Sequence, residues 1–452
     1  MAQAESFNVT EVINRARISG YQWLVLLISL ITAMFDGYDT QGIAYVAPVM
    51  MKDLSIAPED FSFVFSAGLA GLTLGAVFFG MLADKIGRRQ AIIWPIVIFA
   101  IFSILTPAAH TVGSIVTMRI LAGFGLGGTL PSVTAYVLEY SPQRMRGLLV
   151  NSSGAFFAFG SIVGGMLANV LIPTWGWQST FYVGGVVPLL FLVVVVIWLP
   201  ESARFLLLSG KAMERVAAIM QKLVPERGFT LASRFRLEPQ VVGITVKHLF
   251  TEGRALGTVL IWIAFIMNLF VLVYLVFFMP TLLRISGQPI DVAIKVTIFY
   301  GIGGIFGGLI MGWVGDRIRS LYTVLALGYV GAAVFITVAA FSVQNTAILI
   351  PAMFFCGFSI NGGQPSLNTI SGIFYPTAIR ATGIGWALGV GRIGAVVGPL
   401  VGGFLIRTHW PVPAVILANV IPAAIAALCI ALLRRERAAL AAAAGGVLAS
   451  EA

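Results

Sequence analysis

Long apolar segments recur along this chain of 452 residues and limit what it can fold into. A helix of about 20 apolar residues matches the hydrocarbon thickness of a membrane, because it rises about 1.5 Å per residue. We count twelve such segments. Charged residues make up only 10% of the chain, far below the roughly 25% of ordinary soluble domains. The chain is therefore predicted to be an integral membrane protein.

The apolar segments are predicted to be helices. Peptide groups in lipid find no water, and the strands of a barrel would be about ten residues long and alternate in polarity. The fold class predicted is all-α, with twelve transmembrane helices. The predicted spans are residues 21–49, 61–83, 91–110, 114–138, 148–172, 180–200, 256–283, 292–314, 321–341, 346–371, 381–406 and 412–433.

The net charge of +10 is explained by membrane topology rather than by nucleic-acid binding. With a cytoplasmic N-terminus, 22 of the 28 Lys and Arg residues fall on the cytoplasmic side, three lie outside and three fall within spans. Such an excess is typical of cytoplasmic loops, so both termini are predicted to be cytoplasmic. Residues 1–20 are polar and the first apolar run is too long for a signal peptide, so we expect the first helix to stay in the protein.

A hydrophilic stretch between the sixth and seventh spans divides the chain into halves of six spans each. Nine basic residues lie in this stretch, from Arg204 to Arg254. The predicted organisation is a cytoplasmic N-terminal segment at 1–20, a six-helix bundle at 21–200, a central cytoplasmic loop at 201–255, a second bundle at 256–433 and a cytoplasmic tail at 434–452.

Two loop motifs occur twice at nearly the same spacing. GMLADKIGRRQ follows the second span and MGWVGDRIRS follows the eighth, which aligns Asp84 with Asp316 at an offset of 232 residues. SPQRMRG follows the fourth span and YPTAIRATG follows the tenth, which aligns Arg146 with Arg380 at an offset of 234 residues. Two motif pairs at nearly the same offset predict two pseudo-symmetric six-helix bundles.

The motif GMLADKIGRR resembles the loop signature of the major facilitator superfamily, and its weaker copy lies where that family has one. The resemblance covers about residues 20–433. It implies two six-helix bundles beside a central cavity, with the loops after the second and eighth spans forming part of an inner gate. It also implies a monomer.

Charged residues at cytoplasmic helix ends are candidates for gating. A carboxylate there can pair with a basic group or a helix terminus of a neighbouring helix, and that contact can differ between two conformations. Solvated turns whose bases only set the topology are the alternative. The candidates are Asp84, Arg88, Arg89, Glu139, Arg146, Asp316, Arg317 and Arg380.

Asp36 and Asp39, in MFDGYDTQGIAYVAP, are the acids placed deepest in a predicted span. A charge at mid-membrane costs about 2.5 to 3.5 kcal/mol on insertion scales, so it normally has a partner or a function. Three residues apart on a helix, the two acids share a face, and each favours protonation of the other. The three histidines lie in loops or at span ends. We therefore expect proton coupling at the two aspartates; permanent neutralisation of Arg119 in the fourth span is the alternative.

Arg392 lies near the middle of the eleventh span. A guanidinium stays protonated and binds a carboxylate as a planar fork, so this residue is a candidate for binding an anionic substrate. A structural ion pair is the alternative. The tenth span carries three amides, Asn361, Gln364 and Asn368, in NGGQPSLNTISG, which predicts an irregular polar helix lining a cavity.

The segment FDGYD resembles the D-G-x-D signature of the aromatic acid:proton symporters, which import benzoate-type acids in bacteria. The resemblance implies proton-coupled uptake of a small aromatic carboxylate across a bacterial inner membrane by alternating access. It also implies that the following residues are functionally important: Asp36, Asp39, Arg119, Asp84, Arg380 and Arg392. Arg119 thereby joins the substrate-binding candidates.

The sequence also supports alternative functions. PESARFLL resembles the sequence after the sixth span of sugar porters, and GPLVGG resembles a motif of drug:proton antiporters, although here it lies in the eleventh span. A symporter of other organic acids and a membrane solute sensor are further alternatives. An enzyme is not expected, because the sequence has no metal-ligand cluster, no G-x-S-x-G and no H-E-x-x-H. The expected partners are the acid, protons and the lipid bilayer, with no metal, cofactor or nucleic acid.

Overall fold

The computed structural model describes residues 6–209, 213–229, 233–236, 246–318, 320–376 and 379–450. Within this part of the chain, twelve helical stretches are long and apolar enough to cross a membrane, and the predicted fold class is confirmed. The parts of the predicted N-terminal segment, central loop and tail that fall outside these ranges lie outside the described residues.

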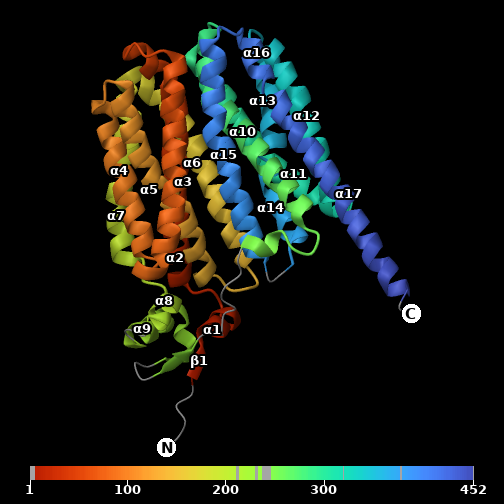
Figure 1. Cartoon of the computed structure of the whole chain (residues 1–452). Helices are drawn as coiled ribbons and strands as arrows, with labels where there is room; N and C mark the ends of the chain where they lie inside the picture. Colours follow the sequence, from red (N-terminus) through yellow and green to blue (C-terminus); the bar gives the residue numbers. More distant parts are fainter. Residues whose placement is uncertain are drawn as a thin grey trace, which may run out of the picture. The chain divides into compact units, whose positions relative to one another are not determined.

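The membrane-spanning helices follow the predicted spans closely (Figure 1). Those before the central loop are α2 Gly20–Asp53, α3 Pro58–Ile86, α4 Gln90–Leu105, α5 Val112–Tyr140, α6 Arg146–Trp175 and α7 Gln178–Trp198. Those after it are α10 Ala255–Ile285, α11 Ile290–Arg317, α12 Leu321–Phe341, α13 Thr346–Ile360 with α14 Gly363–Phe374, α15 Arg380–Arg407, and α16 Val412–Leu417 with α17 Val420–Ser450.

The tenth span is interrupted, as the sequence predicts. The α-helix α13 ends at Ile360, Asn361 and Gly362 form a turn, and α14 begins at Gly363. The last span is also divided, because α16 ends at Leu417 before α17 begins at Val420. Both interruptions lie in the second half of the chain.

The chain separates into two compact units. One contains Met1–Gly42 and Ala67–Val242, and the other contains Ile43–Ser66 and Gly243–Ala452. The segment from Ile43 to Ser66 joins the second unit because its side chains contact α10 and α15. Ser66 Oγ donates to the carbonyl oxygen of Val396 at 2.9 Å, and the Phe65 ring lies edge-on to Phe277 with ring centroids 5.1 Å apart.

Helices α2 and α6 of the first unit approach each other closely at two glycines. A Cβ added to Gly37 would lie 1.9 Å from the carbonyl oxygen of Phe157, and one added to Gly160 would lie 1.8 Å from that of Met34. Only residues without a side chain allow the backbones to come so near. Gly37, beside Asp36, therefore allows α2 to pack closely against α6. Helix α2 is unbroken at this position.

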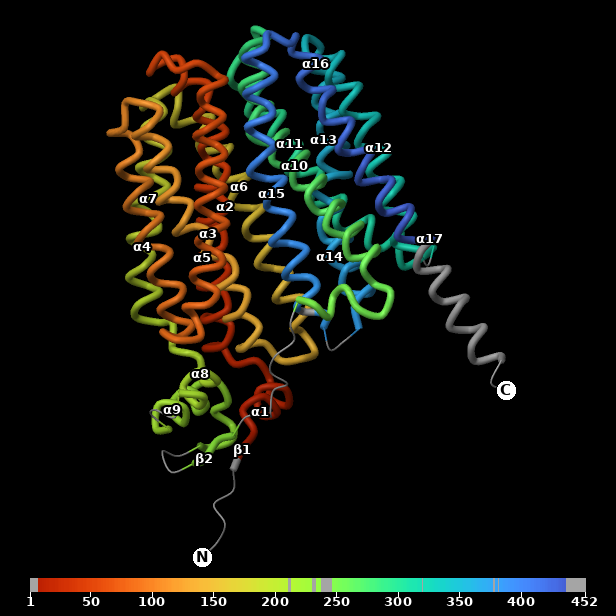
Figure 2. Tube along the Cα trace, viewed as in Figure 1, coloured from red at the N-terminus to blue at the C-terminus, as the bar shows by residue number. Residues whose placement is uncertain are grey.

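A small module outside the membrane-spanning helices belongs to the first unit. Its elements are β1 Ser6–Asn8, α1 Val9–Arg15, α8 Ala203–Leu208, α9 Met213–Leu223 and β2 Arg234–Arg236, with a 3-10 turn at Pro225–Arg227 between α9 and β2. Two further 3-10 turns, at Thr106–Ala108 and Val246–Leu249, lie elsewhere in the chain. The two strands pair in parallel, with Phe7 opposite Phe235. Figure 2 shows α1, α8, α9 and the two strands below the membrane-spanning helices of the first unit.

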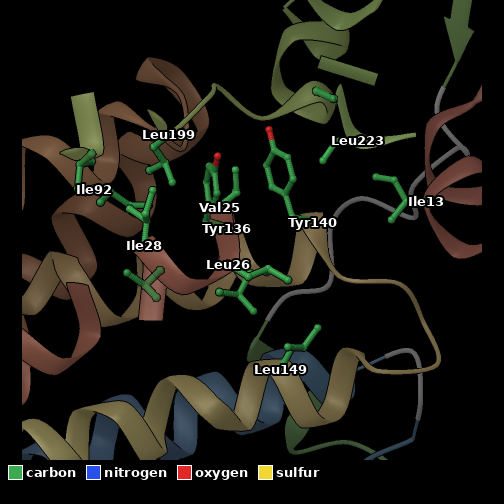
Figure 3. Close-up of a cluster of buried hydrophobic side chains, with 14 of the residues drawn as sticks. Ile13, Val25, Leu26, Ile28, Ile92, Tyr136, Tyr140, Leu149, Leu199 and Leu223 are labelled. Atoms are coloured by element: carbon green, nitrogen blue, oxygen red, sulfur yellow. The ribbon is translucent and has the colours of Figure 1, made fainter. Parts of the chain in front are cut away.

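The module shares one apolar core with the membrane-spanning helices of the first unit. Ile13 of α1 and Leu223 of α9 belong to the same buried cluster as Tyr140 of α5 and Leu199 after α7 (Figure 3). The N-terminal segment and the central loop therefore fold against the first bundle. Arg144 adds polar contacts, because its guanidinium donates to the carbonyl oxygens that end α1.

Candidate functional site

Asp39 is held by side chains from two neighbouring helices. It lies on α2 with 3% of its surface exposed, and Ser103 Oγ of α4 donates to its Oδ1 at 2.6 Å. Arg119 of α5, 4% exposed, places Nη2 3.5 Å from Asp39 Oδ2. A carboxylate and a guanidinium that are buried together compensate part of each other's loss of hydration. Asp39 and Arg119 therefore form a buried ion pair within the first unit.

The guanidinium of Arg119 has further neighbours in the same cluster. Its Nη2 also lies 3.5 Å from Ser103 Oγ, and its Cζ lies 5.2 Å from the centre of the Phe181 ring on α7. The Nε atom of Arg119 is buried and has no hydrogen-bond partner. The guanidinium therefore keeps an unused donor while one nitrogen faces the carboxylate.

Asp36 lies one turn before Asp39 on α2 and is equally buried, with 2% of its surface exposed. Thr40 Oγ1 donates to Asp36 Oδ1 at 3.1 Å. The two acids thus have different surroundings: a guanidinium and a serine contact Asp39, and a threonine of the same helix contacts Asp36. Their proton-coupling role stays a prediction, and so does a substrate contact of Arg119.

A second polar network of the first unit lies where the loop after α3 meets the end of α5. Arg88 places Nη2 2.7 Å from Asp84 Oδ1 and Nε 3.0 Å from Glu139 Oε1, so it joins the loop after α3 to the end of α5. Ser202 Oγ, before α8, donates to the other oxygen of Glu139. Burial lowers the pKa of Arg88, but Glu139 and Asp84 outweigh it and raise that pKa above its usual value.

Glu201 also binds the loop after α3, through backbone N–H groups. Its Oε1 accepts the backbone N–H groups of Arg89 at 3.1 Å and of Ser202 at 2.8 Å. Gly87 makes this possible, because it has a φ of +99° and an added Cβ would lie 2.2 Å from Glu201 Oε2. Burial raises the pKa of Glu201, which backbone hydrogen bonds lower in part.

The other predicted gating residues are more exposed. Asp316, Arg317 and Arg380 are exposed, and the Arg317 guanidinium lies 4.8 Å from the centre of the Trp313 ring. Arg146 is partly exposed, although its Nε is buried without a hydrogen-bond partner. Their gating role also stays a prediction.

Three amide side chains form a hydrogen-bonded relay in the second unit. Asn268 Nδ2 of α10 donates to Gln364 Oε1 of α14 at 2.6 Å, and Gln364 Nε2 donates to Asn368 Oδ1 at 3.3 Å. Asn361, the third amide predicted from the sequence, lies in the turn before α14 against Gly304. The structure thus brings two of the three predicted amides together through a residue that was not predicted.

Arg392 of α15 is partly exposed and lies beside α10. Its neighbour Gly391 faces Phe265 and Leu269, with an added Cβ 3.0 Å from Phe265 Cβ and 3.1 Å from Leu269 Cδ1. Asn268 precedes Leu269, so Arg392 and the amide relay lie within about one helical turn of each other along α10. Guanidinium and amide N–H groups so arranged suit an anion with oxygen acceptors.

The described residues contain no group of three or more His, Cys, Asp or Glu side chains that could hold a metal ion. The polar groups described above are carboxylates, guanidinium groups, hydroxyls and amides, which can form hydrogen bonds and ion pairs with a ligand.

A family model described as the Major Facilitator Superfamily matches residues 29–371 and 287–447. The chain belongs to the major facilitator superfamily. It is therefore a multi-pass membrane transporter and not an enzyme. The resemblance of the repeated loop motifs to this superfamily is confirmed.

Full-length relatives carry the names of aromatic acid transporters. The chain is 33% identical to the 4-hydroxybenzoate transporter PcaK of Acinetobacter baylyi, over 95% of this chain and 94% of that protein. It is 34% identical to a gallate transporter of Pseudomonas putida, over 94% of each chain. It is 30% identical to a benzoate transport protein of Acinetobacter baylyi, over 96% of this chain and 94% of that one.

Solved structures of the superfamily share the fold. A bacterial homologue of the lysosomal transporter Spinster, inward-facing and unoccupied, matches with a TM-score of 0.74 and 15% identity, covering 92% of this chain and 98% of that one. The Escherichia coli xylose transporter XylE, in a partially occluded inward-open conformation, matches with a TM-score of 0.70 and 17% identity, over 90% and 98% of the two chains. These likenesses concern the fold alone.

Sequence reasoning missed five polar residues of these sites: Thr40, Ser103, Asn268, Glu201 and Ser202. Asn268 carried a signal, because a lone amide in the apolar run IMNLFVLVY needs a partner. Ser103 carried none, since serine in a membrane helix commonly bonds to its own backbone. The two residues of the PES stretch were noted only for their resemblance to another branch of the superfamily.

Proposed function

We propose that this chain is a proton-coupled importer of small aromatic carboxylates, acting by alternating access in a bacterial inner membrane with both termini in the cytoplasm. The observation that carries the proposal is the buried pair Asp36 and Asp39, in a chain whose full-length relatives are named for 4-hydroxybenzoate, gallate and benzoate. Buried acids in a transporter span are the natural proton carriers.

The proton step uses the contact between Asp39 and Arg119. While Asp39 is ionised, it compensates the guanidinium, which faces it from 3.5 Å. Protonation of Asp39 leaves the cation without that compensation, and uptake of an anion restores neutrality in the protein. Proton and anion therefore favour the same state, which is the thermodynamic condition for symport. Asp36, one turn away, adds a second carboxylate that shapes the proton affinity of the pair.

The anion is proposed to bind in the second unit at Arg392, with the amides of Gln364, Asn368 and Asn361 as neighbouring contacts. A guanidinium stays charged through the cycle, so the carboxylate is bound whichever way the site opens. The network of Arg88, Glu139 and Glu201 is proposed to hold the cytoplasmic loop after α3 in the conformation that gates exit. The protein is proposed to act as a monomer.

The test is uptake by purified protein in proteoliposomes. Radiolabelled benzoates, phenylpropionates, dicarboxylates and hexoses are offered with and without an inward proton gradient, with valinomycin present to clamp the membrane potential. Accumulation of an aromatic acid that needs the gradient supports the proposal. Accumulation of a hexose instead, or gradient-driven exit of a cationic drug, would refute the substrate class. Uptake of the acid that is indifferent to the gradient would refute coupling.

A further inference from the structure

The amide relay in the second unit has a defined direction. Each amide oxygen accepts from the preceding amide: Asn268 donates to Gln364, and Gln364 donates to Asn368. Among the residues that the structure describes, the second N–H of Gln364 and both N–H groups of Asn368 make no further hydrogen bond. Gln364 and Asn368 are partly exposed, whereas Asn268 is fully buried. The accessible end of the relay thus presents N–H donors.

Asn268 sets this direction. Its Oδ1 is buried without a hydrogen-bond partner, and its Nδ2 is engaged by Gln364. In the reverse orientation the oxygen would face Gln364, and the whole amide NH2 group would be buried without an acceptor. Buried donors without partners are rarer in proteins than under-satisfied carbonyl oxygens. The orientation that sends N–H groups toward the accessible end is therefore the favoured one.

The polarity of the accessible end argues against contact with lipid. Gln364 and Asn368 lie four residues apart on α14, so they share one face of that helix. A row of amides is costly against hydrocarbon and is found where a span lines a cavity. The donors of this face need acceptors.

Arg392 places the same donors beside the proposed anion site. Helices α10 and α15 run in the same direction here. Gly394 faces the carbonyl oxygen of Ile266, and Gly398, four residues later, faces that of Phe270, four residues later on α10. Figure 1 shows the two helices side by side. In this register Arg392 lies about one helical turn from the level of Asn268, from which the relay extends.

We propose that Asn268 is a specificity-determining residue that fixes the relay with its N–H groups outward, so that the transporter prefers aromatic acids carrying a second oxygen acceptor on the ring. This inference rests on the proposed function. Asn268 acts through Gln364 and Asn368, which is a positioning role. A site whose donors expect an acceptor discriminates against an analogue that lacks one, because its polar groups are then left unpaired.

The test compares ligands of equal shape. Methoxybenzoates and ethylbenzoates, substituted at the meta or para position, differ in one ether oxygen that accepts a hydrogen bond and donates none. Each competes with a radiolabelled aromatic acid for the wild-type protein in proteoliposomes. We expect the methoxy acid to compete about tenfold better than its ethyl counterpart at one of the two positions. Equal competition at both positions would overturn the proposal.

Asn268→Leu removes the anchor of the relay, so Gln364 and Asn368 can turn either way. We expect the advantage of the methoxy acid to disappear while unsubstituted benzoate competes as before. Thr281→Val on the same helix is the matched control, because Thr281 Oγ1 is also buried and unpartnered but lies outside the relay. It should keep the advantage. A purely structural role of Asn268 would change competition by all ligands alike and would refute the proposal.

Two further results keep the test decisive. If Asn268→Leu does not fold, Gln364→Met removes the middle of the relay and should abolish the same advantage. If no aromatic acid competes for the wild-type protein, the proposed function fails. If aromatic acids compete and both variants keep the wild-type preference, only the role of Asn268 fails.

Discussion

Arg119 and Asp39 form an ion pair across 3.5 Å, and both side chains are almost completely buried between helices of the first unit. The sequence offered two interpretations of the acids in α2, as proton carriers or as the permanent partner of this arginine. The structure brings Asp39 and Arg119 together and leaves Nε of Arg119 buried without a partner. A pair that is close but incompletely bonded suits a role in which the contact is made and broken.

Arg392 is expected to dominate the affinity for the carboxylate. Arg392→Ala should weaken competition by aromatic acids about 10- to 100-fold, because a charged bidentate contact is lost, and Arg392→Lys should recover part of it. Binding to purified protein, by calorimetry or scintillation proximity, measures the effect. Lys295→Ala is the control, because Lys295 is exposed and pairs with Asp291 at 3.1 Å. Equal affinities for Arg392→Ala and wild type would place the anion elsewhere.

The contact of α2 with α6 should tolerate no side chain at Gly37. Gly37→Ala places a Cβ against the carbonyl oxygen of Phe157, which would force the helices apart and cost about 1 to 3 kcal/mol. Thermal unfolding in detergent and uptake should both suffer. Gly154→Ala on α6 meets nothing within 4 Å and should behave as wild type. Equal losses in the two variants would argue against close packing as the cause.

The polar network around Arg88 should depend more on Glu139 than on Asp84. The side chain of Glu139 is 9% exposed and that of Asp84 is 71% exposed, although both contact Arg88. Glu139→Ala leaves a largely buried arginine without its main partner and should lower the free energy of unfolding by about 1 to 3 kcal/mol. Asp84→Ala should cost about 0 to 1 kcal/mol, because solvent screens its charge. Thermal unfolding of both variants measures the difference, and a reversed order would contradict it.

Glu201 should make the stability depend on pH. Burial raises the pKa of Glu201 in the folded protein, so the folded state holds that proton more tightly than the unfolded chain does. This contribution is fully present below the unfolded pKa and is lost as the pH rises through the folded one. Thermal unfolding between about pH 4 and about pH 8 should therefore show a decline that Glu201→Gln lacks. The same decline in Glu201→Gln would assign it to another group.

The sequence predicted the helices well because membrane helices are dictated by length and hydropathy. The span predicted at 321–341 matches α12 Leu321–Phe341, and the irregular tenth span is interrupted at Asn361 and Gly362. Glycine and amides within an apolar run were enough to indicate the interruption. Each of these features is local, so it can be read without knowing the tertiary packing.

The partners of individual polar residues could not be predicted, because they depend on packing between distant segments. Phe7 lies opposite Phe235 in a two-stranded sheet that no local pattern indicates. Ser103 reaches Asp39 only because α4 packs beside α2, and Asn268 reaches Gln364 from a different helix. Asp36, Asp39 and Arg392 were found because charges are costly within a membrane span, and the three amides because they make the tenth span polar and irregular, whereas their contacts needed the structure.

Proton movement coupled to the acid tests the central claim most directly. Proteoliposomes containing a pH-sensitive dye receive an inward gradient of an aromatic acid, with valinomycin present and no initial pH gradient. Wild type should acidify the interior as the acid enters, whereas Asp39→Asn should exchange labelled for unlabelled acid without moving protons. Acidification by Asp39→Asn equal to that of wild type, after correction for protein-free vesicles, would contradict the assignment of the proton to this residue.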